Sequence, residues 1–126
     1  MAKDCDAWII DGVLTAATRV HTELGPGLLE SVYERALALE LEAAGLRAAS
    51  QVPVPVIYRG QDVGVVFRAD LVVEDQLLLE LKCVEQLSAL HVAQTVTYLK
   101  LLGLKRGFLI NFNTRLLKHG IRRVSF

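Results

Sequence analysis

The sequence predicts an α/β protein of the α+β type, in which helices flank a mixed central β-sheet. Three stretches carry apolar residues at helical spacing, five short stretches are apolar and β-rich, and Gly or Pro residues separate many of them. Their order is helix, helix, three strands, helix, two strands. The chain has 126 residues, of which 52% are apolar, so we expect one domain spanning residues 1–126.

Two helices are predicted to open the chain. Apolar residues recur every three or four positions from Ile10 to Leu24, and again from Leu28 to Ala44. The run at positions 25–27, Gly-Pro-Gly, separates the two helices because neither residue type continues a helix readily. His21 falls on the buried face of the first helix, where we expect a hydrogen-bonded core or boundary histidine in preference to a catalytic one.

Three strands are expected next, over residues 51–58, 63–73 and 77–84. Pro53 and Pro55 lack a backbone N–H, so the first of these strands should lie at a sheet edge. Residues 59–62 resemble a turn, and residues 74–76 form the next connection. A third helix is predicted over residues 89–102, ended by Gly103, before strands at 108–112 and 121–126, the last one after a turn at 118–120.

The charges balance overall but are unevenly distributed. Fourteen Lys and Arg offset fourteen Asp and Glu, which excludes a uniformly basic coat for nonspecific binding of nucleic acid. Residues 1–45 carry eight acids and three bases, whereas residues 99–126 carry seven bases and no acid. The basic tail is either a phosphate contact surface or an ordinary solvated rim. Its candidate phosphate-binding residues are Lys100, Lys105, Arg106, Arg122 and Arg123.

The sequence favours a cytoplasmic protein. No apolar run approaches the roughly 18 residues needed to span a bilayer, and no apolar stretch typical of a secretory signal is found near the start. Only Cys5 and Cys83 occur, which argues against a disulfide scaffold or a zinc knuckle, and both are expected to be reduced.

Charged residues inside apolar strands are the most informative positions. Asp70 interrupts the second predicted strand, while Glu80 and Lys82 interrupt the third and share one face because side chains alternate along a strand. The loop between the strands decides where Asp70 points. A three-residue loop at 74–76 places Asp70 opposite Glu80, whereas a two-residue loop turns it to the other face.

With the three-residue loop, two carboxylates lie about 5 Å apart at Cβ beside an ammonium group. Such carboxylates are good ligands for a hard divalent cation, so Mg²⁺ or Mn²⁺ is the expected cofactor. The cation would polarise a phosphoryl oxygen, and Lys82 would orient water or stabilise negative charge. A structural cluster of ion pairs formed by Asp70, Glu80 and Lys82 is the alternative.

Two further features point to the same site. Gln94 and Tyr98 lie four residues apart on the third predicted helix, so their polar heads project together and could hold phosphate or water. Taken alone, a Gln and a Tyr at this spacing are more often surface residues or residues at the boundary between surface and core. Glu30 lies in the first turn of the second helix, where its carboxylate either reaches inward or simply favours the helix dipole.

The ordered set of these motifs resembles a known family. Residues 27–33, GLLESVY, resemble the signature of the GxxExxY family, and the resemblance continues through Asp70, Glu80-x-Lys82 and Gln94-xxx-Tyr98. That family is placed in the PD-(D/E)xK nuclease-like superfamily, with a restriction-endonuclease-like core. Ala69 stands where the Pro of the superfamily's name would be.

The resemblance implies roles for these residues. It implies that Glu30, Asp70, Glu80 and the Leu81 carbonyl are metal ligands, that Lys82 is the catalytic lysine, and that Gln94 and Tyr98 complete the site. The expected function is Mg²⁺-dependent hydrolysis of phosphodiesters, with DNA as the favoured substrate and RNA not excluded. A domain this small would engage DNA through a homodimer, a partner protein or its basic tail. The alternative is a catalytically inactive nuclease fold that binds metal or protein.

Overall fold

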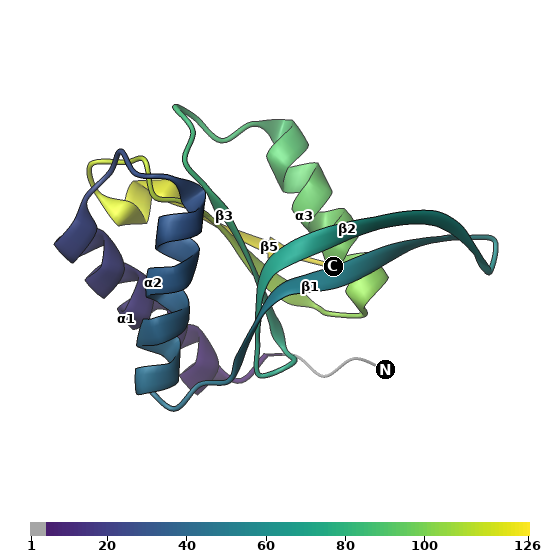
Figure 1. Cartoon of the computed structure of the whole chain (residues 1–126), viewed down its shortest axis with the longest axis horizontal. Helices are drawn as coiled ribbons and strands as arrows, with labels where there is room; N and C mark the ends of the chain where they lie inside the picture. Colours follow the sequence, from purple (N-terminus) through teal and green to yellow (C-terminus); the bar gives the residue numbers. More distant parts are fainter. Residues whose placement is uncertain (1–4) are drawn as a thin grey trace.

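The computed structural model of the chain describes residues 5–126, which form a five-stranded mixed sheet with helices on both faces (Figure 1). The strands lie in the order β1-β2-β3-β4-β5, and all neighbours are antiparallel except β3 and β4, which are parallel. The elements are α1 Ala7–Leu24, α2 Glu30–Ala43, β1 Ala48–Tyr58, β2 Gln61–Val73, β3 Leu77–Lys82, α3 Ala89–Leu102, β4 Arg106–Asn111, the short 3₁₀ helix η1 Leu117–Gly120 and β5 Ile121–Ser125.

The predicted order of elements and fold class are confirmed, and the deviations are at element ends. β3 stops at Lys82 instead of continuing to Val84, because the Asn111 side chain takes over the hydrogen bonds there. Its Oδ1 accepts from the Val84 N–H at 3.1 Å, and its Nδ2 donates to the Val84 carbonyl at 2.8 Å. The predicted turn at 118–120 is part of η1. As expected for a strand that contains prolines, β1 is at the edge of the sheet.

Each face of the sheet has its own apolar layer. Leu77, Leu79 and Leu81 of β3 pack with α1 and α2, whereas Leu78 packs with Leu99 on the α3 face. The even-numbered residues of β3 therefore face α3, and Glu80 and Lys82 belong to this set. No helix of residues 5–126 has both the length and the apolar character of a membrane span.

A stacked aromatic pair fixes the position of α2. The rings of Tyr33 and Phe112 lie parallel with centroids 4.5 Å apart, and neither residue is exposed. The Tyr33 hydroxyl donates to the Gly25 carbonyl and accepts from the Leu28 N–H at 3.2 Å, so it also holds the loop before α2. Through these contacts one side chain sets where α2, and its first residue Glu30, begins.

The sheet opens between β2 and β3. Their ladder runs from the Val73–Leu77 pair only as far as Leu71 and Leu79, although β2 continues back to Gln61. The rest of β2 and its partner β1 project beyond the body as a two-stranded arm (Figure 1). The alternation of side chains changes at the opening, because Leu71 faces α1 and α2 while Ala69 faces α3. Asp70 lies between them, at the point where β2 separates from β3. We call this point the fork.

Replacing Phe112 should strongly destabilise the protein, because the change leaves a cavity against Tyr33. We expect Phe112→Ala to lower the free energy of unfolding by about 3–5 kcal/mol in urea denaturation. Phe126→Ala removes the same side chain at a position that is 61% exposed and serves as the control. It should change stability by no more than about 0.5 kcal/mol. Equal losses in the two variants would contradict this account of the α2 anchor.

Candidate active site

Asp70 lies opposite Glu80 at the fork. The connection from β2 to β3 is the three-residue loop, because Val73 pairs with Leu77, so the register condition from the sequence is confirmed. The Asp70 Oδ2 accepts from the Leu81 N–H at 2.8 Å, and the Asp70 N–H donates to Glu80 Oε2 at 3.4 Å. The Asp70 carboxylate thus accepts the hydrogen bond that a main-chain carbonyl of β2 would accept in a continuous ladder. This contact directs the Asp70 side chain toward β3.

Glu80 is the most perturbed acid of the site. It is 6% exposed, and its Oε1 is buried without a hydrogen-bond partner among residues 5–126. Burial raises the pKa of Glu80 to about 9, and the neighbouring Asp70 carboxylate adds to the rise through a shared hydrogen bond and charge repulsion. Near neutral pH and without a cation, Glu80 is therefore protonated.

Lys82 follows Glu80 on the same face of β3. Its side chain is half-buried, and its positive charge acts to lower the pKa of Glu80. The opposing effects of burial and Asp70 are larger, so this ammonium does not neutralise Glu80 as a structural ion pair would. Between them, Leu81 is a buried residue of β3, paired with Ile110 of β4.

Glu30 reaches a different part of β3. Its Oε2 accepts from the Cys83 N–H at 3.3 Å, just beyond Lys82, and its charge contributes to raising the pKa of the Cys83 thiol, which burial raises most. Among residues 5–126, no group of three or more His, Cys, Asp or Glu side chains is already arranged around one cation position. The structure thus joins Asp70 and Glu80 and places Glu30 at the carboxyl end of β3.

Sequence reasoning missed two residues at the fork, Glu34 and Gln51. The Gln51 Nε2 donates to Glu34 Oε1 at 2.7 Å and lies 3.5 Å from Asp70 Oδ1. Burial and the nearby Asp70 raise the pKa of Glu34. The available signal for Glu34 was its position one helical turn after Glu30, which puts both carboxylates on one face of α2.

The two residues of the predicted pair on α3, Gln94 and Tyr98, differ in burial. Tyr98 is buried, its ring lies 6.0 Å from that of Phe67, and burial followed by the charges of Glu80 and Asp70 raises the pKa of its hydroxyl. Tyr98 therefore lies close enough to feel the acidic pair. Gln94 is exposed on the same helix. The nearby His91 has a structural role, since its Nδ1 accepts from the Ser88 N–H at 3.1 Å in a capping box.

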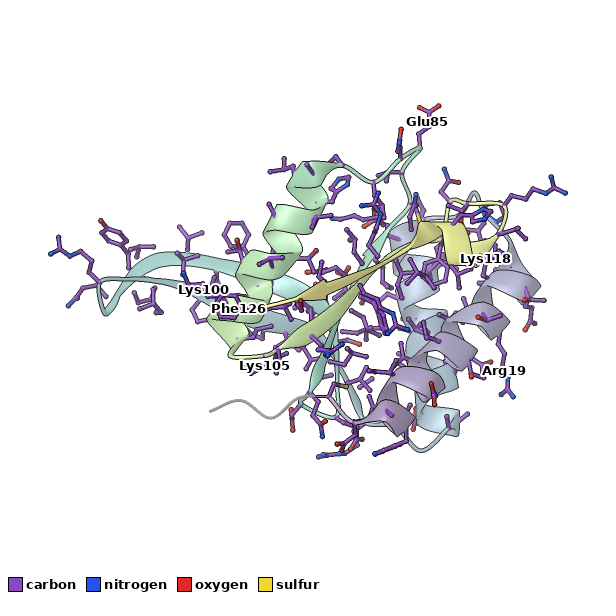
Figure 2. All side chains as sticks on the ribbon, turned by 180° about the vertical axis from the view of Figure 1, so that it is seen from behind. Arg19, Glu85, Lys100, Lys105, Lys118 and Phe126 are labelled. Carbon is purple, nitrogen blue, oxygen red and sulfur yellow. The ribbon has the colours of Figure 1, made fainter. Side chains whose placement is uncertain are left out.

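The basic tail does not gather on one surface. Lys100 and Lys105 lie near the carboxyl end of α3, whereas Lys118 lies on another side of the molecule (Figure 2). Arg122 and Arg123 are neighbours on β5 and so point to opposite faces of the sheet, and Arg123 lies over the Phe108 ring at 5.5 Å. Arg106 pairs with Leu77, at the end of β3 away from Lys82.

One prediction outside the fork agrees with the structure. His21 is buried and its Nε2 lies 2.7 Å from the Thr114 carbonyl, so it is a hydrogen-bonded core residue, as expected.

Comparison with known families now identifies the fold. The profile of the PD-(D/E)XK nuclease superfamily matches residues 8–124, which is nearly the whole chain. The chain belongs to the PD-(D/E)XK nuclease superfamily. The match spans every element that builds the fork, from α1 to β5. Neither the curated proteins nor the solved structures gave a significant match to this chain. Members of this superfamily typically use divalent metal ions and act on nucleic acid.

The raised pKa of Glu80 should make stability depend on pH. The folded state holds a proton that the unfolded state releases near 4.5, so the free energy of unfolding falls as pH rises from about 5 toward 9. The slope is at most about 1.4 kcal/mol per pH unit for one proton. Urea denaturation in chelator at several pH values measures it. Glu80→Gln, which cannot titrate, should flatten the slope, and an unchanged slope would contradict the assignment.

Asp70 can be tested with two substitutions that separate its charge from its hydrogen bond. Asp70→Asn keeps an oxygen that accepts from the Leu81 N–H and breaks no ion pair, because Glu80 is protonated without a cation, so we expect stability within about 1 kcal/mol of wild type in chelator. Asp70→Ala leaves that N–H without its acceptor and should cost about 1–3 kcal/mol. A loss of several kcal/mol in Asp70→Asn would instead favour a structural ion-pair cluster.

Proposed function

We propose that this protein is a Mg²⁺-dependent nuclease of the GxxExxY type that hydrolyses phosphodiester bonds of DNA. The observation that carries the proposal is the fork itself. Asp70 and Glu80 face each other there, Glu80 has a buried oxygen without a partner, and Lys82 follows on the same face. In a chain of this superfamily, such a carboxylate pair beside a lysine supports catalysis more than a purely structural role.

The donor set suits a hard divalent cation. Two carboxylates that share one site repel each other when both are ionised. Burial contributes most to the raised pKa of Glu80, and the neighbouring Asp70 adds to it. A cation supplies the missing partner for the Glu80 Oε1. In this proposal Asp70, Glu80, the Leu81 carbonyl and Glu30 hold Mg²⁺ or Mn²⁺. When bound, the cation polarises a phosphoryl oxygen and lowers the pKa of water.

The chain's own residues orient the chemistry. The Leu81 N–H holds the Asp70 carboxylate, and the Asp70 N–H holds Glu80, so neither acid has to be reoriented as substrate arrives. The Lys82 ammonium carries positive charge on the face of these acids, where it can donate to a phosphate oxygen and stabilise negative charge as it develops. The Tyr98 hydroxyl, on the same side, is a further donor for phosphate or water.

Substrate contacts must be local because the net charge is zero. The candidate phosphate contacts Lys100, Lys105, Arg106, Arg122 and Arg123 lie on more than one surface, so these five residues do not form a continuous basic track. A second copy or a partner protein would extend the contact surface. RNA as substrate is an outcome that the cleavage assay distinguishes.

A non-catalytic module is the second candidate. One observation favours it. Within residues 5–126, no three His, Cys, Asp or Glu side chains are already arranged around one metal position. The two candidates differ in turnover. Both allow a cation to bind, but only the nuclease loses an activity when Lys82 is removed.

Cleavage of single-stranded DNA, double-stranded DNA and RNA in Mg²⁺ tests the proposal. We expect cleavage of DNA that falls at least about a hundredfold in Lys82→Ala, because the ammonium at the site is lost. Lys118→Ala removes an exposed lysine of η1, which is not part of the proposed site, and should retain activity. Equal activity in wild type, Lys82→Ala and Asp70→Asn would show contamination and overturn the assignment, and cleavage of RNA alone would correct the substrate.

A further inference from the structure

We propose that Glu34 of α2 is an additional carboxylate of the divalent-cation site, delivered to Asp70 by the Gln51 side chain. The inference rests on the proposed function and adds a residue to that site. It concerns how α2 approaches the site, since Glu30 reaches the Cys83 N–H just after β3 whereas Glu34 reaches Gln51 of β1.

The contacts at Gln51 carry the argument. One amide nitrogen lies 2.7 Å from Glu34 Oε1 and 3.5 Å from Asp70 Oδ1, so two acidic oxygens from different elements converge on a single donor. A carboxamide donor between two carboxylates occupies a position that suits positive charge. Glu34 is only partly exposed, whereas Glu42 of the same helix is exposed.

The Gln51 backbone has an uncommon conformation. Its φ is 52°, a left-handed value that residues other than Gly, Asn and Asp adopt with difficulty. Backbone strain of this kind persists where the surroundings enforce it, and it is concentrated at functional sites. Gln51 lies at the fork, level with Asp70, where the pairing of β1 with β2 is interrupted between Ser50–Leu71 and Val52–Ala69. With this backbone conformation, the Gln51 carboxamide contacts both Glu34 and Asp70.

An independent observation indicates that a ligand belongs here. Glu80 is 6% exposed and its Oε1 has no hydrogen-bond partner among residues 5–126. Asp70 contacts Glu80 on one side and Gln51 on the other, so it lies between the orphaned oxygen and Glu34. A cation bound by Asp70 and Glu80 therefore has the Glu34 carboxylate within reach, because Gln51 holds that carboxylate next to Asp70.

Binding of Mn²⁺ to the full chain, measured by calorimetry and by electron paramagnetic resonance, tests this role without any substrate. Glu34→Gln keeps an oxygen that accepts from Gln51 but removes the charge, so the fold should be retained, with an unchanged melting temperature in chelator. We expect its affinity for Mn²⁺ to fall at least about tenfold. Glu42→Gln, an exposed glutamate of the same helix, is the matched control and should bind as wild type does.

A second pair of variants isolates the positioning role of Gln51. Gln51→Gly accepts the left-handed backbone but removes the amide, and we expect it to weaken Mn²⁺ binding by severalfold. Glu34→Asp retains the charge on a shorter side chain and should recover part of the affinity that Glu34→Gln loses.

The outcomes separate this inference from the proposed function. If Asp70→Asn abolishes Mn²⁺ binding while Glu34→Gln binds like wild type, Glu34 is not a ligand and the inference is overturned, with the nuclease site intact. If wild type binds no Mn²⁺, both proposals fail. Loss of affinity in Glu34→Gln and in Asp70→Asn, but not in Glu42→Gln, supports both.

Discussion

The interruption of the sheet at Asp70 is the constraint on which the rest of the site depends. A continuous ladder between β2 and β3 would direct main-chain groups toward each other and leave no space for side chains in the plane of the sheet. Because the ladder ends at Leu71, the Leu81 N–H takes a carboxylate oxygen as its partner. Because a side-chain oxygen replaces a main-chain carbonyl as the acceptor, the Asp70 carboxylate is directed toward Glu80. The helices α2 and α3 then approach this pair from opposite faces of the sheet.

The interior position of Glu80 links stability to binding. Burying a carboxyl group among leucines is unfavourable unless it is protonated or paired, and the fold accepts this cost at one position. A ligand that pairs with the ionised carboxylate relieves the cost only in the folded state, so binding and folding favour each other. The stacked Tyr33 and Phe112 rings keep α2 in place next to the site, where the burial of Glu80 is unfavourable.

Sequence reasoning predicted the fold well and the site in part. Element order, the proline-bearing edge strand and the hairpin register follow from local rules, because side-chain period and loop length constrain the pairing of Asp70 with Glu80. It could not find Gln51, since a left-handed glutamine within a β-rich run has no local signature. Nor could it separate Glu30 from Glu34, because one helical turn decides whether the carboxylate reaches the Cys83 N–H just after β3 or Gln51 of β1.

The two prolines of β1 have a consequence for the arm that leaves the body of the protein. An apolar hairpin with Ile57, Val65 and Phe67 partly exposed is the kind of segment that recruits further strands and grows into insoluble fibres. Pro53 and Pro55 offer no N–H to an incoming chain along the outer edge of β1. The two prolines therefore leave gaps in the row of donors that a further strand would need, which opposes edge-to-edge association of the arm.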